Sequence, residues 1–297
     1  MDSISSSSGA ELPGILSELG TGAHLISERD TIDALLESSN RTSVAVRRSF
    51  VQDRQAEDRP APGSLAALVR GGRRSTFDQY LLLLAWAGGP ESTLCLDSRV
   101  WARMLGLPMT DASRRTISRN WKILSGLRLV SIRRAGRQIS ATALCEDGSG
   151  GPYVHPEEDH EPSLQLPYSY WRERYHKRLT VPGKAVLLIA LTLGDWFALP
   201  TRRGPLWYGL SRSTLERGFK NAYDCAALGT RYSLKEAPLA PAGYTKENHY
   251  ILLAPFGPRG IIAKTAPPNY NTRWPRPKRM PRKRPKRRRA SNRAEES

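Results

Sequence analysis

Apolar residues recur every three or four positions in the stretch that starts near residue 97, which is the spacing of one helix face. Val100, Met104 and Leu107 share that face. Asp97 stands before them as a candidate N-cap, since its carboxylate can accept a hydrogen bond from the first turn. Pro108 is expected to end the helix, because proline has no backbone N–H to donate to the preceding turn.

A second helix is predicted directly after the first, with Ser113 as its candidate N-cap. Ile117, Trp121 and Leu124 form an apolar stripe on this helix that we expect to be buried. The other side of the helix is basic and polar, and it consists of Arg114, Arg115, Ser118, Arg119 and Lys122.

Two strands joined by a tight turn are predicted next along the chain. Val130 and Ile132 alternate with polar residues, as the residues of a half-buried strand do. Gly136 supplies the turn, and the alternation continues on the return strand at Ile139, Ala141 and Ala143. Basic residues gather near the tip of this hairpin, namely Arg133, Arg134 and Arg137.

A helix, a turn, a second helix and a β-hairpin in this order resemble the winged-helix family of DNA-binding domains. The resemblance implies that the second helix enters the major groove, while the hairpin, or wing, contacts the adjacent backbone or minor groove. Residues 97–144 contain ten Lys and Arg against two Asp, and most of the basic residues fall on those two elements. The alternative is a structural helical hairpin with a solvated basic face, which a run of charge alone would fit equally well.

The segment before this region completes the first domain, which we place at residues 75–145. Residues 76–87 predict a strongly apolar helix that ends at a Gly-Gly-Pro sequence, and residues 93–96 predict a short strand. Residues 1–74 are expected to be flexible, because Ser, Gly, Pro and mixed charges dominate their composition. A short helix over 31–37 is the exception, with Ile32, Leu35 and Leu36 on one face.

Residues 146–165 have an acidic composition and are interpreted as a linker. Their first seventeen positions contain six Asp and Glu and no Lys or Arg, amid Gly and Pro. His155 and His160 are expected to be exposed in this linker, because their spacing matches no known metal site. An acidic linker between basic domains could also fold back over them when DNA is absent.

The same plan is predicted again over residues 166–257, which we interpret as a second domain. Residues 166–179 predict an amphipathic, aromatic helix, and a buried helix begins near residue 180. Two strands around a Pro- and Gly-containing connection are expected to end the domain. Between these elements lies a helix with the apolar stripe Leu215, Phe219 and Ala222. Its polar side carries Arg212, Ser213, Arg217 and Lys220, which are the candidate DNA contacts of this domain.

The run from Pro182 to Phe219, with its Trp-Tyr-Gly-Leu-Ser segment, is similar to a group of actinobacterial proteins described as winged-helix or MarR-like regulators. The resemblance covers roughly residues 167–257 and implies DNA binding without naming a target. The sequence departs from that group at residues 224–228, where the second hairpin is expected to start. Residues 180–256 hold nine Lys and Arg against five Asp and Glu. This domain is therefore expected to bind DNA more weakly, to read a second half-site, or to serve self-association.

The composition of the whole chain supports a polyanionic partner. The net charge is +18 and the pI is about 10.3, which favours nucleic acid or an acidic membrane surface as the partner, and the winged-helix resemblance selects double-stranded DNA. The longest apolar runs fall short of the ~20 residues of a membrane span, and the Ser-rich N-terminus does not resemble a signal peptide. Three distant cysteines and the absence of a CxxC motif favour the reducing cytoplasm and argue against a zinc site.

The C-terminal residues 258–297 are expected to be a disordered basic tail. From residue 264 onward there are thirteen Lys and Arg against two Glu, and prolines interrupt any helix. Such a segment binds phosphates without reading bases, by releasing counterions. The densest part of the tail, and the candidate nonspecific contact, comprises Arg282, Lys283, Arg284, Lys286, Arg287, Arg288 and Arg289.

The sequence thus predicts a mainly α protein with small β-hairpins (α+β), built of two winged-helix domains in tandem with disordered termini. No P-loop, HExxH or GxSxG motif is present, so we expect neither an enzyme nor a bound cofactor or metal. The leading hypothesis is a sequence-specific regulator of transcription in the cytoplasm, associated with the nucleoid, with a homodimer as its candidate assembly. The alternatives are a plasmid or integrative-element replication initiator and a nonspecific RNA-binding or nucleoid-coating protein.

Removal of residues 264–297 is expected to weaken binding to random and cognate DNA by similar factors. Each phosphate that the tail neutralises adds ~0.9 to the slope of log K against log salt on duplex DNA. A salt titration of both DNAs with the full-length and truncated proteins measures this change. The division between tail and domains would be wrong if truncation abolished the cognate preference and left random binding intact.

Overall fold

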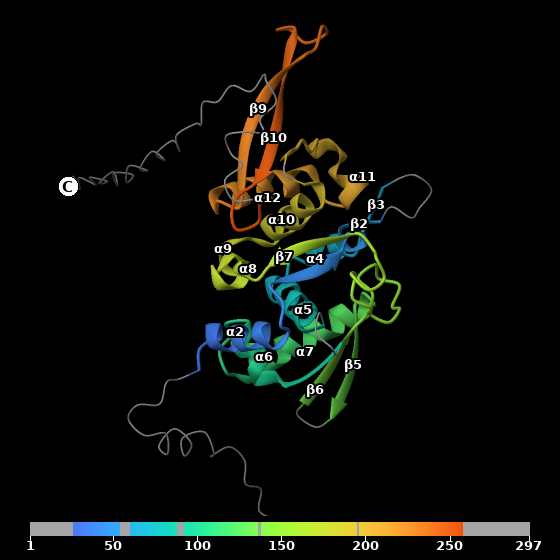
Figure 1. Cartoon of the computed structure of the whole chain (residues 1–297), viewed down its shortest axis with the longest axis vertical. Helices are drawn as coiled ribbons and strands as arrows, with labels where there is room; N and C mark the ends of the chain where they lie inside the picture. The colour runs from blue at the N-terminus through green and yellow to red at the C-terminus, as the bar shows by residue number, and fades with distance from the viewer. Residues whose placement is uncertain (1–25, 54–59, 88–91, 136–137, 195, 258–297) are drawn as a thin grey trace, which may run out of the picture.

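The computed structural model describes residues 26–53, 60–87, 92–135, 138–194 and 196–257, and these form an α+β fold with four small antiparallel sheets. The elements fall into two units at opposite ends of the molecule, with a two-stranded sheet and short helices between them (Figure 1). We call these the first unit and the second unit.

The first unit begins with a buried helix and ends with a hairpin. In chain order its elements are α5 (Arg74–Ala87), β4 (Thr93–Asp97), α6 (Ser98–Met104), α7 (Asp111–Gly126), β5 (Val130–Ala135) and β6 (Gln138–Ala143). The strand order in its sheet is β4-β6-β5. The last strand therefore lies in the middle, and it pairs with both the hairpin partner and the strand that precedes α6.

The second unit repeats this order of elements. It comprises α10 (Val181–Leu193), β8 (Trp196–Phe197), a 3-10 turn (Thr201–Arg203), α11 (Gly204–Tyr208), α12 (Arg212–Asp224), β9 (Leu228–Glu236) and β10 (Tyr244–Leu252). Its strand order is β8-β10-β9, so the last strand again lies in the middle. The two hairpins point away from each other, toward the two ends of the molecule (Figure 1).

The helices α7 and α12 end in the same backbone motif, which aligns the two units residue by residue. The residue after each helix's C-cap has a positive φ, 56° at Arg128 and 58° at Ala226. The next backbone N–H then bonds to a carbonyl five residues back, from Leu129 to Leu124 and from Ala227 to Ala222. When Arg128 is aligned with Ala226, the apolar stripe of α7 matches that of α12 position by position. Ile117, Trp121 and Leu124 are then equivalent to Leu215, Phe219 and Ala222. All six of these side chains are buried, as their periodicity predicted.

The segment before the first unit is folded over its described residues 26–53 and 60–73, so the expectation that residues 1–74 are flexible is wrong for this part. Its elements are α2 (Glu28–Ser38), β1 (Ser43–Arg47), α3 (Arg48–Val51), β2 (Gln52–Asp53), β3 (Ala61–Pro62) and α4 (Leu65–Arg70). The short helix predicted over 31–37 is confirmed within α2, where Ile32, Leu35 and Leu36 are buried. β1 pairs with β7 (Ser163–Pro167), a partner too distant in sequence for local composition to indicate.

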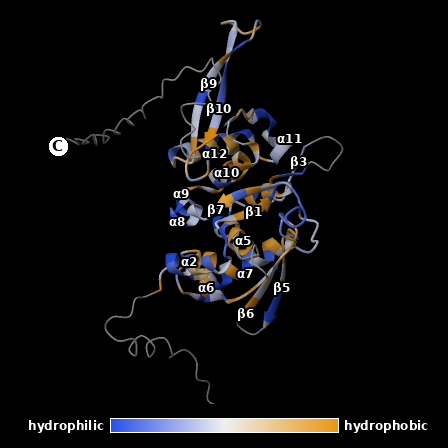
Figure 2. Cartoon of the chain, in the orientation of Figure 1, coloured by the Kyte–Doolittle hydropathy of each residue, from blue (hydrophilic) through white to orange (hydrophobic). Residues whose placement is uncertain are grey.

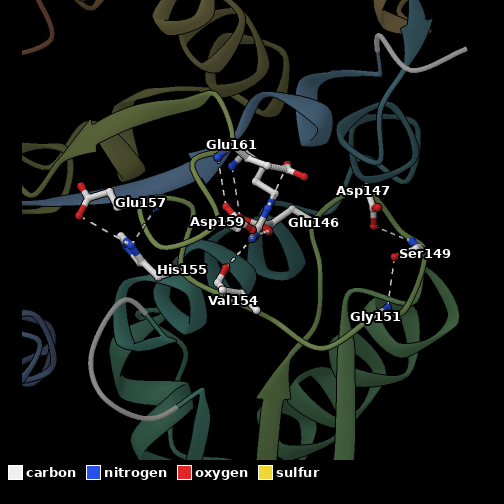
Figure 3. A network of polar contacts seen from close by, with 10 residues as sticks. Glu146, Asp147, Ser149, Gly151, Val154, His155, Glu157, Asp159 and Glu161 are labelled. Carbon is white, nitrogen blue, oxygen red and sulfur yellow. Dashed lines mark hydrogen bonds and ion pairs between the residues drawn. The ribbon is translucent and has the colours of Figure 1, made fainter.

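The acidic segment is packed against β1 and does not form a free linker. The Arg47 side chain is 2% exposed, and it makes ion pairs with Glu146, Asp159 and Glu161 (Figure 3). Burial raises the pKa of Glu146, while the neighbouring Arg47 acts to lower it. His155 is buried, contrary to expectation, and His160 is exposed as predicted. Composition failed here because the acidic charges compensate one buried cation from a distant strand.

Two predicted helix boundaries also need correction. The helix expected over residues 166–179 is instead the end of β7 followed by α8 (Ser169–Arg172) and α9 (Tyr175–Arg178), separated by Arg174 with a φ of 62°. α6 begins at the predicted cap, where the Asp97 carboxylate accepts from the Arg99 N–H. It ends at Met104, well before Pro108, because Gly106 adopts a φ of 63° and closes the helix with a turn.

The two units share one hydrophobic core, to which both α5 and α10, two strongly apolar helices, contribute buried residues (Figure 2). A buried ion pair crosses between these helices, from the Lys184 ammonium of α10 to the Asp78 carboxylate of α5. Burial lowers the pKa of Lys184 to about 8 and raises that of Asp78. Each charge is therefore stable inside the protein only because the other lies beside it.

Removal of one member of this pair is expected to destabilise the protein by about 3–5 kcal/mol, because the other charge stays buried and unpaired. The changes are Asp78→Leu and Lys184→Met. The double variant is expected to recover most or all of the loss, since apolar side chains of similar size fill the same space. Urea unfolding of the wild type and the three variants measures this coupling. Single variants as stable as the wild type would show that the pair is solvated.

Candidate nucleic-acid interface

Contacts of its buried face fix the orientation of helix α7 about its own axis. Trp121 is 1% exposed and packs edge-on against Trp101 of α6, with ring centroids 5.0 Å apart. Asn120 is also buried, where its side chain accepts from the Thr76 hydroxyl at 2.8 Å and donates to the Gln79 amide oxygen at 2.9 Å. These polar contacts tie α7 to α5 and fix which side of α7 faces outward. Sequence periodicity predicted the role of Trp121 but missed that of Asn120.

α7 begins three residues before its expected first turn. The N-cap is Thr110, whose hydroxyl accepts from the Ser113 N–H, and Asp111 lies in the first turn. Ser113 was expected to be the N-cap, and it is instead a buried residue inside the helix. A Thr three positions before a Ser, followed by an acidic residue, is a typical helix start, so this boundary was available from the sequence.

The polar face of α7 lines one open groove of about 910 Å³ together with the hairpin. The groove is formed by Ser98, Asp111, Arg114, Arg115, Ser118, Arg119, Lys122, Arg134 and Ile139. All five α7 residues predicted as DNA contacts are therefore brought together, and one of the predicted hairpin residues joins them. Ser98, Asp111 and Ile139 were not predicted as contacts. Ser98 is the first residue of α6, Asp111 is the first residue of α7, and Ile139 lies in β6.

The two described arginines of the hairpin lie on opposite faces of the sheet. Arg134 pairs with Ile139 and shares a face with Val130 and Ile132, whose side chains turn toward the core. Arg133 pairs with Ser140 and therefore lies on the other face. Sequence reasoning grouped them as one patch, although strand alternation already separated them. Arg137, the third predicted hairpin residue, lies outside the described residues, as do the tail residues 282–289.

The groove carries a strong positive charge. Its lining includes five cationic side chains and one carboxylate, that of Asp111. Arg114 makes an ion pair with Asp111, and its hydrogen bond lowers the pKa of that carboxyl group. Within the described part of the chain, no acidic side chain forms an ion pair with Arg115, Arg119, Lys122 or Arg134. These four cations are available to an anionic ligand.

The dimensions of the groove suit a duplex better than a small molecule. The sixteen residues of α7 span roughly 24 Å at 1.5 Å per residue. The major groove of B-DNA admits a helix, and arginine can pair with both acceptors of a guanine edge. The helix thus presents cations along its length, and Arg134 of the hairpin adds another beside it.

The equivalent helix of the second unit has a different electrostatic character. The four predicted contacts Arg212, Ser213, Arg217 and Lys220 are all exposed on the outer side of α12. Arg212 is paired with Glu216 at 2.7 Å and Lys220 with Asp224 at 2.5 Å. Two of its three cations are therefore neutralised within the helix. Contact of α12 with DNA stays a prediction that this charge distribution disfavours.

Aligned positions show the same contrast between the two units. Glu216 stands where α7 has Ser118, and Tyr232 stands where the first hairpin has Arg134. A carboxylate and an aromatic ring thus replace a hydroxyl and a cation at the positions that line the groove of the first unit. The second unit repeats the backbone plan of the first without repeating its charge.

No group of three or more His, Cys, Asp or Glu among the residues that the structure describes is arranged to hold a metal ion. Cys95, Cys145 and Cys225 are free thiols. Within the described residues, none of the helices combines the length and apolar character needed to cross a bilayer.

Comparison of the chain with protein-family models, with curated proteins and with solved structures finds no match. The assignment of function therefore depends on the chemistry of the groove. Its defining features are four cations without an acidic partner among the described residues, contributed by one helix and one hairpin.

Arg134→Ala is expected to weaken duplex binding and to lower the salt slope by about one unit, because one phosphate contact is lost. Arg133→Ala removes the same charge from the opposite face of β5 and is the matched control, with little expected change. Fluorescence anisotropy with a random-sequence duplex over a salt series measures both variants. Equal losses from the two variants would show that hairpin charge acts at long range and that the groove is not the site.

Proposed function

We propose that this chain is a sequence-specific double-stranded DNA-binding protein that regulates transcription, built of two winged-helix units in tandem. The observation that carries the proposal is the groove between α7 and the β5–β6 hairpin, lined by five cations and one carboxylate. The first unit is the DNA-reading unit in this proposal. The chain acts by binding and is not an enzyme.

The order of elements and strands supports the winged-helix assignment. A helix, a strand, a helix-turn-helix and a hairpin occur in that order, and the hairpin's second strand pairs with the early strand. The same connectivity occurs in both units. In such domains the second helix of the helix-turn-helix lies in the major groove, which assigns base contact to α7.

Each side chain of the groove has a distinct role in this proposal. Arg115 and Arg119 lie on the exposed side of α7 and reach base edges, where arginine selects guanine. Lys122 and Arg134 contact phosphates and fix the register of the protein on the duplex. The Arg114–Asp111 ion pair holds that arginine beside the helix N-terminus. The basic tail adds affinity that is independent of sequence and retains the protein on the nucleoid in the cytoplasm.

The repeated unit also favours a second candidate function, initiation of plasmid or integrative-element replication. Initiators of that class use tandem winged helices, and two units with one strand order are present in this chain. The two functions differ in their DNA sites. A regulator is expected at a single operator near a promoter, whereas an initiator is expected at iterated repeats in an origin.

Selection of bound duplexes from a random library is expected to enrich one short motif. The motif should persist when residues 264–297 are removed, because base contact belongs to α7. Arg119→Ala is expected to relax the preference at one base pair, at a cost of about 1–3 kcal/mol on the selected site. Lys122→Ala should weaken all duplexes alike and serves as the comparison. Failure to enrich any motif would overturn sequence-specific binding and leave nonspecific coating as the function.

A further inference from the structure

The hairpin of the second unit carries an apolar face beyond the body of the protein. β9 and β10 pair over nine residues each and extend away from the helices (Figure 1). Tyr232, Leu234 and Tyr244 are 43%, 67% and 53% exposed. Exposed apolar side chains that cluster on one face indicate an interaction site rather than ordinary surface.

These three side chains share one face of the hairpin, and that face continues into the core. Leu234 pairs with Lys246, and Tyr232 lies two residues before Leu234 on the same side of β9. Closer to the body, Tyr250 lies on this side and stacks on Phe219 of α12, with ring centroids 4.1 Å apart. Apolar side chains therefore run outward from the core along β9, on the side of the hairpin that faces α12. On β10, Asn248 and Lys246 lie between Tyr250 and Tyr244, and the Lys246 ammonium lies 4.1 Å from the centroid of the Tyr232 ring.

α12 presents an alternating row of charges beside this stripe. Arg212, Glu216, Lys220 and Asp224 follow one another at every fourth position, so the signs run plus, minus, plus, minus. All four are exposed, and the outer members pair with their neighbours within the helix. On a solvated helix such exposed pairs contribute little to stability.

This row of charges is complementary to itself when two copies of α12 run antiparallel. Arg212 then lies opposite Asp224 of the partner subunit, and Glu216 lies opposite Lys220 of the partner subunit. A two-fold interface requires this property, because the same patch must meet itself. The exposed row on α7 is not self-complementary, because cations are in excess there. Opposed copies of α7 would repel each other.

We propose that α12 and the apolar face of the β9–β10 hairpin form the interface between two copies of this chain. The aligned positions favour protein over DNA as the partner, since Glu216 and Tyr232 replace a hydroxyl and a cation of the DNA-reading groove. A carboxylate at the centre of the helix repels phosphate, and it attracts a lysine of an antiparallel copy. The interface itself does not depend on the proposed DNA-binding function.

Such a dimer has a consequence for that function. The two hairpins of one chain point to opposite ends of the molecule (Figure 1). Association through the second unit therefore leaves the α7 grooves of the two copies at the outer ends of the assembly. Each dimer would present two separate duplex sites, suited to bringing two DNA segments together.

The test reverses single charges and then restores the complementarity. Glu216→Lys places two cations opposite each other across the two-fold axis, and Lys220→Glu places two carboxylates there. Each change in the full chain is expected to weaken self-association by at least about tenfold, the equivalent of about 1.4 kcal/mol. Sedimentation of nuclease-treated protein at physiological salt measures the dissociation constant. Glu37→Lys, on the exposed side of the distant α2, is the matched control and is expected to leave it unchanged.

A mixture of Glu216→Lys and Lys220→Glu proteins is expected to form mixed dimers, because every opposed pair across the axis is then attractive. The double variant within one chain is expected to dimerise for the same reason, although it places like charges beside each other within its own helix. Leu234→Ser tests the apolar face separately and is expected to weaken the dimer without affecting the fold, since its side chain is exposed.

Three results would overturn the proposal. One is a wild-type chain that stays monomeric at high micromolar concentration. Another is a failure of the mixed single variants to associate. The third is a gain of duplex affinity in Glu216→Lys and a loss in Lys220→Glu with no change in the self-association of either variant, which would assign α12 to DNA.

Discussion

The edge-on packing of Trp121 against Trp101 fixes the rotation of α7, and the charge of the groove depends on that rotation. Trp121 is buried at the contact of α6 and α7, and the Asn120 side chain bonds to α5 beside it. With this face held inward, the cations of the same helix must point outward into the groove. A helix rotated by one residue would bury an arginine and expose the tryptophan, at a large cost in free energy. The stability of the unit and the positive charge of the groove are thus set by opposite faces of one helix.

Two units with one backbone plan have diverged in what their outer faces offer. Helix, strand and C-cap geometry repeat from α5–β6 to α10–β10, and the buried positions align. The outer faces differ: one carries mostly unpaired cations, while the other carries internally paired charges beside exposed aromatic residues. The buried Asp78–Lys184 pair and the β1–β7 sheet join the units into one body. We propose that DNA binds to the outer face of the first unit and that a second copy of the chain binds to the outer face of the second unit.

The elements with a regular local pattern were predictable from the sequence, and those that depend on distant contacts were not. The buried stripes of α7 and α12 and the two hairpins followed from periodicity alone. β1 escaped prediction because its pairing partner, β7, comes more than a hundred residues later in the chain. Arg47 and Glu146 were assigned to flexible segments because composition shows a charge but not its partner. Within the site, the cations of α7 were predicted, whereas Arg133 and Arg134 were grouped as one patch although strand alternation places them on opposite faces.

The central claim is that duplex DNA binds in the groove between α7 and the β5–β6 hairpin. Photocrosslinking from a residue that lines this groove tests it most directly. A crosslinker on Ser118→Cys, in a chain whose exposed Cys95 is changed to Ser, lies among the groove cations. The same reagent on Ser131→Cys lies on the opposite face of β5. Our account predicts efficient crosslinks from residue 118 that map to major-groove base positions, and few from residue 131. Crosslinks of equal yield from both positions, or from residue 131 alone, would contradict it.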